Sequence, residues 1–511
     1  MMNKLSPILL AAGLTLFSAP SFSQKKNTTP PEFSIKPSET EAHMRFLASD
    51  ELMGRRTGEQ GNYVAARYIA EQFRKLGVKP VASENAASPT KSYFQNVPFE
   101  KLGVNQSGEI VAEATTMKSG DDWILMTGGA TDTTAALVYA GYGLENAAKG
   151  WDDYKNLDVK NKIVLVQSGT PDVQTPSEII ASSTEKRKIA IEKGALAIIE
   201  LFNAPMPWNM VNKYFTGEKI GLAPESAAGK TIPHAWVNGK DANLTRALRN
   251  VKEIHFKTSG RQTKLINSYN VVGFIEGSDP KLKDEYILLT AHYDHVGVGK
   301  QGGQPFTAED SIFNGARDNA FGVVGLLTAA ESFSKVPPKR SVLIVALTAE
   351  EVGLLGSQYY AAHPLLPLNK CIFNINSDGA GYNDTTIVAV MGLDRTGAKA
   401  EMEKAAKAFG LGIFADPSPE QGLFDRSDNV SFAKKGIPAP TFTPGFREFN
   451  GDIMKNYHQV SDNPETINFG YLQKFSQAYT YAARLIADMP KAPQWVAGDK
   501  YEEAAKKLYV K

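Results

Sequence analysis

Three apolar segments in the C-terminal half constrain the fold of this chain most strongly. They span residues 286–291, 341–347 and 371–375, and they show no regular alternation of apolar and polar residues. Such segments are typical of strands covered by helices on both faces of a sheet. Segments with helical spacing alternate with them, at residues 319–333, 353–362, 398–409 and 469–489. This order predicts an α/β fold with a doubly wound, mostly parallel sheet flanked by helices.

Histidine or acidic residues follow each of the three predicted strands. His292 and Asp294 come at the end of the first, Glu350 and Glu351 follow the second, and Asp378 follows the third. In open α/β sheets the carboxyl ends of the strands meet at one crevice, where ligands bind. We therefore expect these side chains to gather in a single site.

His292 and Asp294 are two residues apart, so extended backbone would place their side chains on the same side. Asp294 is then expected to accept the second ring N–H of His292 and to orient it as a metal ligand. Glu350 and Glu351 are adjacent, so their side chains diverge. One can bind a metal ion while the other faces the water bound to it.

Asp318 precedes a predicted helix, and two roles are open to it. It can cap the helix, which aspartate does well, or its two oxygens can bridge two cations. We favour the bridge, because a cap leaves the nearby histidine unexplained. His458 lies in a polar loop before the last predicted helix.

Together these positions supply two imidazoles and three carboxylates, a set that suits zinc better than copper or an iron–sulfur cluster. The sequence contains no H-E-x-x-H and no G-x-S-x-G. It therefore lacks the signatures of single-zinc helix proteases and of serine hydrolases.

Five ordered blocks of sequence resemble a known family, the co-catalytic dizinc aminopeptidases and carboxypeptidases, which include aminopeptidase Y and the bacterial leucyl aminopeptidases. The blocks are Ala-His-Tyr-Asp at 291–294, Gly-Ala-Arg-Asp-Asn-Ala at 315–320, Glu-Glu-Val-Gly-Leu-Leu-Gly-Ser at 350–357, Asn-Ser-Asp at 376–378 and Tyr-His at 457–458. The resemblance covers roughly residues 35–130 and 268–489. It implies the zinc-exopeptidase (phosphorylase/hydrolase-like) fold and peptide substrates.

The resemblance also implies roles for single residues. One zinc ion would be held by His292, Asp318 and Asp378, and a second by Asp318, Glu351 and His458. Glu350 would be the general base, and Asp294 would orient His292.

Two departures from the family pattern bear on the substrate pocket. Gly379 and Ala380 follow Asp378 where many relatives have a bulkier residue, and Asn429 stands where histidine is common.

The segment 131–265 has a different texture, with short strands, turns and a helix. It resembles the protease-associated (PA) domain that many such enzymes carry as an insertion. We expect it to separate an N-terminal part of the peptidase domain (35–130) from the main part (266–490), with residues 491–511 as a C-terminal tail.

The N-terminus has the pattern of a secretory signal peptide over residues 1–23. Lys4 precedes an apolar run at 8–17, and Ser21-Phe22-Ser23 provides the small-x-small ending. A polar leader at 24–34 follows. Export to the periplasm or the medium is therefore expected, and no later segment has the roughly 20 apolar residues of a stable membrane span.

The net charge bears on the possible partners, and the cysteine content bears on disulfide bonds. The chain has 56 basic and 55 acidic residues, a formal charge of +1, so no uniform field favours nucleic acid. Cys371 is the only cysteine, which rules out an intrachain disulfide, and we expect it to be a small core residue.

Two alternatives to an aminopeptidase follow from the sequence. A carboxypeptidase needs a cation for the terminal carboxylate, and Arg317, Arg426 and Arg447 are candidates. An aminopeptidase needs acidic groups for the terminal amine, and these are also present. The second alternative is a non-catalytic receptor-like binding protein, which the complete ligand set disfavours. Oligomeric state and side-chain preference do not follow from the sequence.

Overall fold

The structure is a computed structural model that describes residues 29–83, 90–103, 107–172, 176–223 and 231–510. The predicted signal peptide and the first part of the polar leader lie outside these residues. Within the described ranges, no helix combines the length and apolar character that crossing a bilayer requires.

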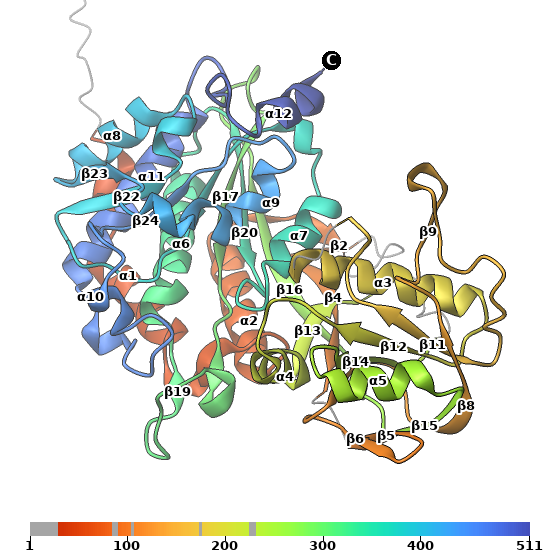
Figure 1. The fold of residues 1–511 in the computed structure, drawn as a ribbon. Helices are drawn as coiled ribbons and strands as arrows, with labels where there is room; N and C mark the ends of the chain where they lie inside the picture. The colour runs from red at the N-terminus through yellow and green to blue at the C-terminus, as the bar shows by residue number, and fades with distance from the viewer. Residues whose placement is uncertain (1–28, 84–89, 104–106, 173–175, 224–230, 511) are drawn as a thin grey trace, which may run out of the picture.

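A ten-stranded sheet forms the centre of the larger unit (Figure 1). Its order is β13 (Lys219–Leu222), β4 (Phe94–Leu102), β16 (Thr263–Ile275), β20 (Ser341–Leu347), β17 (Tyr286–His292), β21 (Cys371–Ser377), β24 (Thr441–Pro444), β22 (Ile387–Met391) and β23 (Gly412–Ala415), with β1 (Lys79–Pro80) beside β16. The four central strands β20, β17, β21 and β24 are parallel, as predicted. Antiparallel pairs join on both sides, so the sheet is mixed at its flanks.

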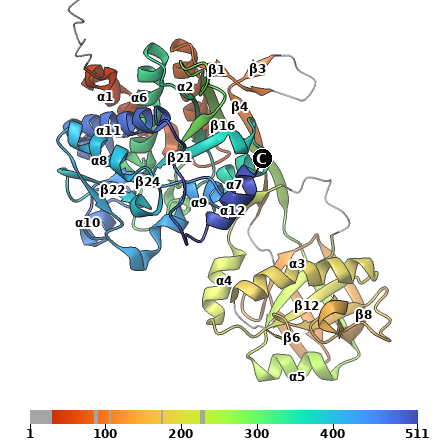
Figure 2. The same cartoon turned by 90° about the horizontal axis from the view of Figure 1, so that it is seen from above.

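Helices cover both faces of this sheet, which confirms the doubly wound architecture (Figure 2). One face packs against α1 (Pro37–Leu47), α2 (Gln60–Lys75), α6 (Phe321–Lys335), α8 (Lys399–Ala408) and α11 (Phe469–Ala487). The other packs against α7 (Leu355–Ala362), α9 (Asn429–Ala433) and α12 (Glu502–Tyr509). The four helices predicted from residue 319 onward are present, with ends that differ by at most two residues.

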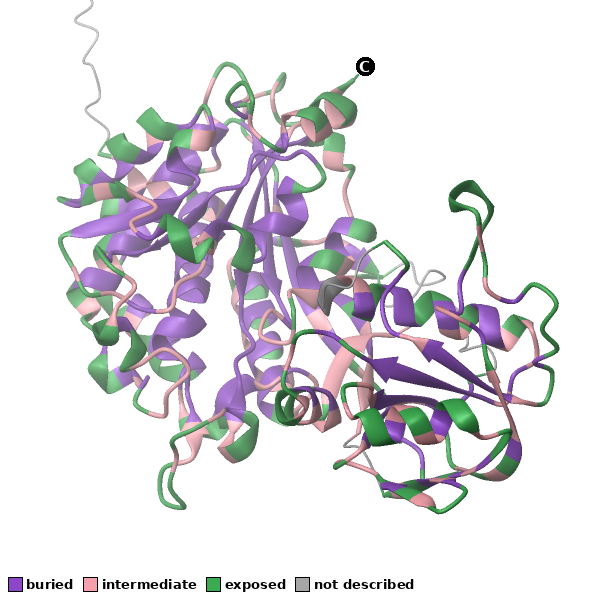
Figure 3. Cartoon of the chain, viewed as in Figure 1, coloured by how far each residue is buried: buried purple, intermediate pink, exposed green. Residues whose placement is uncertain are grey.

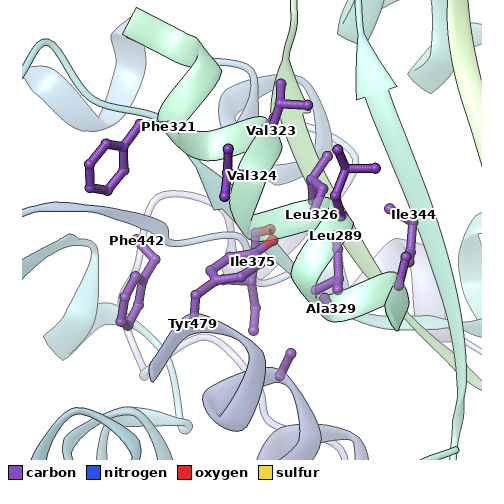
Figure 4. Packing of buried hydrophobic residues seen from close by; sticks show 14 of the residues in the cluster. Leu289, Phe321, Val323, Val324, Leu326, Ala329, Ile344, Ile375, Phe442 and Tyr479 are labelled. Carbon is purple, nitrogen blue, oxygen red and sulfur yellow. Dashed lines mark hydrogen bonds between the residues drawn. The ribbon is translucent and has the colours of Figure 1, made fainter. Parts of the chain in front are cut away.

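The strand β17 shows why its sequence carries no polar face. Ile287 and Leu289 enter the core on the side of α6, while Tyr286 and Leu288 enter the opposite core. All seven residues of the strand are buried (Figure 3). The side chains of α6 interdigitate with those of the sheet and with Tyr479 of α11 (Figure 4).

A second sheet of eight strands lies beside the first (Figure 1). Its order is β6 (Thr115–Lys118), β5 (Gly108–Ala112), β15 (Glu253–Thr258), β8 (Thr131–Tyr139), β11 (Ile163–Gln167), β12 (Ala197–Phe202), β14 (His234–Asn238) and β7 (Trp123–Thr127), accompanied by α3 (Pro176–Glu192), α4 (Trp208–Thr216) and α5 (Ala242–Asn250).

The predicted boundary at residue 131 does not match the start of this sheet. The strands β5, β6 and β7 precede residue 131, yet they belong to the second sheet. The strand β5 pairs with β15 and β7 pairs with β14, so residues 108–127 complete both edges of that sheet. The unit therefore begins near Gly108.

One strand of this segment returns to the large sheet. The strand β13 pairs with β4 at the sheet edge, and its residues Ile220 and Leu222 pack in a small apolar cluster with Val97, Phe99 and Ala349. The two units are therefore joined by backbone pairing as well as by the chain connections.

A fully buried carboxylate, Glu200, lies in the second unit. Lys186 donates to it at 2.8 Å, Ser183 at 2.6 Å, His234 at 3.0 Å and the Trp236 indole at 2.9 Å. Burial acts to raise the pKa of Glu200, but Lys186 and His234 outweigh it and lower that pKa to about 2. A buried charge held by several donors is stable only while its partners remain.

We predict that Lys186→Met lowers the free energy of unfolding of the second unit by about 3–5 kcal/mol, because it leaves Glu200 charged and unpaired. Chemical denaturation followed by tryptophan fluorescence measures this, since Trp236 contacts Glu200 directly. The double variant Lys186→Met/Glu200→Gln should recover much of the loss. A loss below 1 kcal/mol in the single variant would show that the pair is not a net requirement for stability.

Candidate metal centre

The carboxyl ends of the central strands carry the predicted residues into one cavity. His292 ends β17, Glu350 and Glu351 follow β20, and Asp378 follows β21. Asp318 lies between β19 (Ile312–Phe313) and α6, and His458 follows α10 (Gly451–Met454). All six side chains line a cavity with an empty volume of about 680 Å³ that opens to solvent.

Five of these groups form two sets of donor atoms that share Asp318. His292 Nε2 lies 3.3 Å from Asp318 Oδ1 and 3.1 Å from Asp378 Oδ1. His458 Nε2 lies 3.2 Å from Asp318 Oδ2 and 3.0 Å from Glu351 Oε2. In each set the potential ligand atoms lie within 4.8 Å of one another. Asp318 therefore presents one oxygen to each set, as a bridging carboxylate would.

The capping role of Asp318 is not observed. The helix α6 has no side-chain hydrogen bond at its N-cap, and both Asp318 oxygens face histidines instead. The backbone N–H groups of Arg317 and Asp318 donate to Asp462 at 2.8 and 3.3 Å. Asp462 thus anchors the segment from behind and leaves the Asp318 carboxylate free to enter the cavity.

Asp294 lies close to His292, but its contacts differ from those expected. Its carboxylate is 3.8 Å from His292 Nδ1, and the nearer acceptor for that nitrogen is the Asp294 backbone carbonyl at 3.2 Å. The carboxylate accepts the backbone N–H groups of Glu350 and Glu351 at 3.1 and 3.3 Å and the Thr57 hydroxyl at 3.1 Å. The chain leaves the extended conformation after His292, so the two-residue alternation does not apply. Asp294 positions the glutamate loop as well as the histidine.

The pKa values of the acidic groups in the site reflect their burial and their close packing. Burial, together with the neighbouring charges of Asp378 and Glu351, raises the pKa of Glu350 well above its ordinary value, against the effect of His292. Burial also acts to raise the pKa of Asp318, but hydrogen bonds from His292 and His458 outweigh it and hold that pKa well below its usual range. The pKa values of Glu350 and Asp318 are therefore shifted in opposite directions within one cavity.

His295 belongs to the site, although the sequence analysis did not single it out. Its Nδ1 lies 2.7 Å from Glu351 Oε1, and it forms a donor set with Asp318, Glu351 and His458. Gly315 makes room for its ring, since a Cβ at Gly315 would lie 2.6 Å from the imidazole. The available signal was its position directly after Asp294 in the strand-end block.

Arg55 is the second residue that sequence reasoning missed. Its buried guanidinium donates to the backbone carbonyls of Tyr293 at 2.7 Å, Asn314 at 2.6 Å and Gly315 at 3.0 Å, and also to that of Leu47. It therefore ties the loop after His292 to the segment that carries Asp318. No local pattern marks such a contact, because three of its four partners lie about 240 to 260 positions away.

Two residues at the site adopt left-handed backbone conformations. Ala349, directly before the glutamate pair, has φ 61°, and His458 has φ 52°. Such conformations are uncommon for residues other than glycine and often occur at functional sites.

Comparison with known proteins relates part of the chain to a peptidase family. Residues 270–483 match Peptidase family M28, and this range includes every one of the predicted site residues. This segment of the chain, 270–483, is therefore similar to peptidase family M28. The chain is 26% identical to Aminopeptidase YwaD of Bacillus subtilis (strain 168) over 503 residues, which cover 96% of this chain and 94% of that protein. It is 24% identical over 368 residues to the probable leucine aminopeptidase 2 of Aspergillus oryzae, covering 67% of this chain and 66% of that protein.

A solved structure supports the fold of the chain. The aminopeptidase from Aneurinibacillus sp. strain AM-1 is similar with a TM-score of 0.52 and 21% sequence identity, covering 91% of this chain and 95% of that one. The zinc-exopeptidase fold that the resemblance implied is therefore confirmed.

The positions that depart from the family pattern fall into two places. Gly379 and Ala380 line the cavity, and a Cβ at Gly379 would lie 2.3 Å from the Thr443 hydroxyl. The glycine at position 379 thus follows from the close approach of β24. Asn429 is buried outside the cavity lining and donates to the Ala439 carbonyl at 3.0 Å.

We predict that His295→Ala weakens the binding of Zn²⁺ about 10- to 100-fold, because Glu351 loses the hydrogen bond that orients it. Competition with a chromogenic chelator measures the affinity. His255→Ala is the matched control, since His255 is a surface residue of the second unit. Equal zinc affinity in both variants would remove His295 from the site.

Proposed function

We propose that this protein is an exported dizinc exopeptidase that removes N-terminal residues from peptides, with Glu350 as general base. The observation that supports it is the convergence of His292, Asp318, Glu351, Asp378 and His458 beside Glu350 in one open cavity. The name of the relative that covers nearly the whole chain, Aminopeptidase YwaD, supports the reaction class.

The residues present fit a pair of zinc ions. Imidazole and carboxylate are donors that zinc accepts, and each set of three donors leaves a position open for water or substrate. Asp318 provides one oxygen to each set. When bound, two zinc ions would polarise the scissile carbonyl and lower the pKa of an attacking water.

The chemistry of the chain itself centres on Glu350. Its carboxylate faces the cavity within 4.8 Å of donor atoms of His292 and Glu351. From this position it takes a proton from the attacking water and delivers it to the leaving amine. Asp294 keeps Glu350 in place through the backbone N–H of the same residue.

Two of the three arginines that a carboxypeptidase could use are already paired. Arg317 binds Asp462 at 2.9 Å and the Thr466 hydroxyl at 2.6 Å, and Arg447 binds Asp384 at 2.7 Å. Four carboxylates line the cavity, and those of their oxygens that would not hold zinc are available to a substrate ammonium group. Of the three arginines, only Arg426 is then left for a terminal carboxylate, and the name of the relative that covers nearly the whole chain supports the aminopeptidase. The complete set of donors favours an enzyme over a receptor-like binding protein.

The proposal includes two features that rest on sequence. Residues 1–23 would direct export, with cleavage before Gln24, and identification of the mature N-terminus tests this. The unit built on the second sheet would be an inserted PA domain.

We predict that Glu350→Gln keeps about two zinc ions per chain but loses at least roughly a hundredfold in kcat, because the amide cannot accept the proton. Metal analysis and steady-state kinetics on the same preparation measure the two quantities. Glu309→Gln, at an exposed loop position, is the control. Full activity in Glu350→Gln would exclude the assigned base.

A panel of peptides tests the reaction class. Peptides that begin with a free leucine should be cleaved, and their N-acetylated forms should not, because the acidic cavity recognises the ammonium group. A chelator should abolish the cleavage and added Zn²⁺ should restore it. Cleavage of the N-acetylated forms from their C-terminus would replace the aminopeptidase with the carboxypeptidase alternative.

A further inference from the structure

The short 3-10 helix η9 (Leu423–Arg426) forms part of the cavity wall. In this type of helix, residues i and i+3 lie on the same side. Leu423 and Arg426 are related in this way, and both line the cavity. The helix therefore presents one apolar and one cationic side chain to the substrate.

The opposite side of η9 is fixed by the C-terminal tail. The Phe424 ring packs against Trp495 and Tyr501, with ring centroids 6.2 and 6.1 Å apart. Asp425 accepts hydrogen bonds from Lys500 at 2.5 Å and from the Tyr501 hydroxyl at 2.9 Å. Asp425, the sequence neighbour of Arg426, is therefore bound by the C-terminal tail on the far side of the helix and does not pair with Arg426.

Arg426 has no ion-pair partner within the ranges that the structure describes, whereas Arg317 and Arg447 are both paired. Its side chain is exposed. Its neighbour Ser427 is buried, and the Ser427 hydroxyl donates to Asp378. The free guanidinium thus stands on the segment that touches a proposed zinc ligand.

The charge balance of the cavity indicates that Arg426 is available to bind an anionic group. Four carboxylates line the cavity, those of Asp318, Glu350, Glu351 and Asp378, and the two divalent cations of the proposed function would offset their charge. Arg426 then remains as an unpaired positive charge. A planar guanidinium binds carboxylates through two parallel hydrogen bonds, which a single ammonium group cannot do.

We propose that Arg426 binds a carboxylate of the substrate and thereby favours peptides that carry one close to the scissile bond. This inference rests on the proposed function. The carboxylate belongs either to the side chain of an N-terminal acidic residue or to the C-terminus of a dipeptide. In both cases the apolar side chains of Leu423, Met391 and Phe446 in the same cavity contact the carbon skeleton of the substrate.

Two matched substrate pairs separate these sources. The 4-nitroanilides of glutamate and glutamine differ only in a side-chain carboxylate, and leucylglycine and leucylglycinamide differ only in a C-terminal one. For each pair, the ratio of kcat/KM is compared in the zinc-loaded parent, Arg426→Gln, Arg426→Lys and Arg447→Gln. A ratio is insensitive to a general loss of activity.

We expect the ratio of one pair to fall about five- to tenfold in Arg426→Gln, with a smaller fall in Arg426→Lys and none in Arg447→Gln. A fall for the anilides assigns the carboxylate to the N-terminal side chain, and a fall for the dipeptides assigns it to the C-terminus. Unchanged ratios for both pairs would overturn the inference while leaving the aminopeptidase intact.

The inference is also testable if the proposed function fails. If the parent cleaves none of these substrates, calorimetric affinities of L-glutamate and L-glutamine, and of the two dipeptide forms, for the zinc-loaded protein replace the rates. A preference for the carboxylate form that is lost in Arg426→Gln would support the role of Arg426 and refute only the reaction. No dependence on Arg426 would refute the role as well.

Discussion

The mutual repulsion of four carboxylates in one cavity is the constraint on which the rest of the structure depends. Asp318, Glu350, Glu351 and Asp378 would not gather in a partly dry cavity without compensation. The two histidines provide part of it through direct contacts with three of the acids. Arg55 adds a buried positive charge behind the site. Bound cations would offset the negative charge that remains.

The surrounding fold is arranged to hold this cluster against its own repulsion. The central parallel strands are buried on both faces, so their ends cannot shift without opening two cores. Asp294 and Asp462 then act from outside the cavity, each by accepting two backbone N–H groups of the loops that carry the acids. The carboxylates of Asp294 and Asp462 thus bind backbone N–H groups and thereby position the carboxylates that line the cavity.

The sequence could predict the fold and most of the site because both follow from local patterns. The apolar runs before His292, Glu350 and Asp378 indicate buried strands. The polar residues that follow indicate where these strands end. Asp294 and His295 were assigned less well, since the alternation of side chains applies only while the strand continues, and β17 ends at His292.

Other features could not be predicted because they depend on partners that are distant in sequence. Arg55 acts through carbonyl groups, which no residue type reveals. The strands β5 to β7 look like any short strands, and only their pairing assigns them to the second sheet.

The strand β13 connects the second unit to the large sheet, close to the loop that carries Glu350. Ile220 and Leu222 pack in the same small cluster as Ala349, the residue that immediately precedes the glutamate pair. They also cover the edge of β4, whose backbone groups would otherwise be open to pairing with another chain. The strand β13 therefore supports the large sheet through side-chain packing as well as through backbone pairing. Removal of this strand would take away apolar contacts beside the loop of Glu350 and expose the edge of β4.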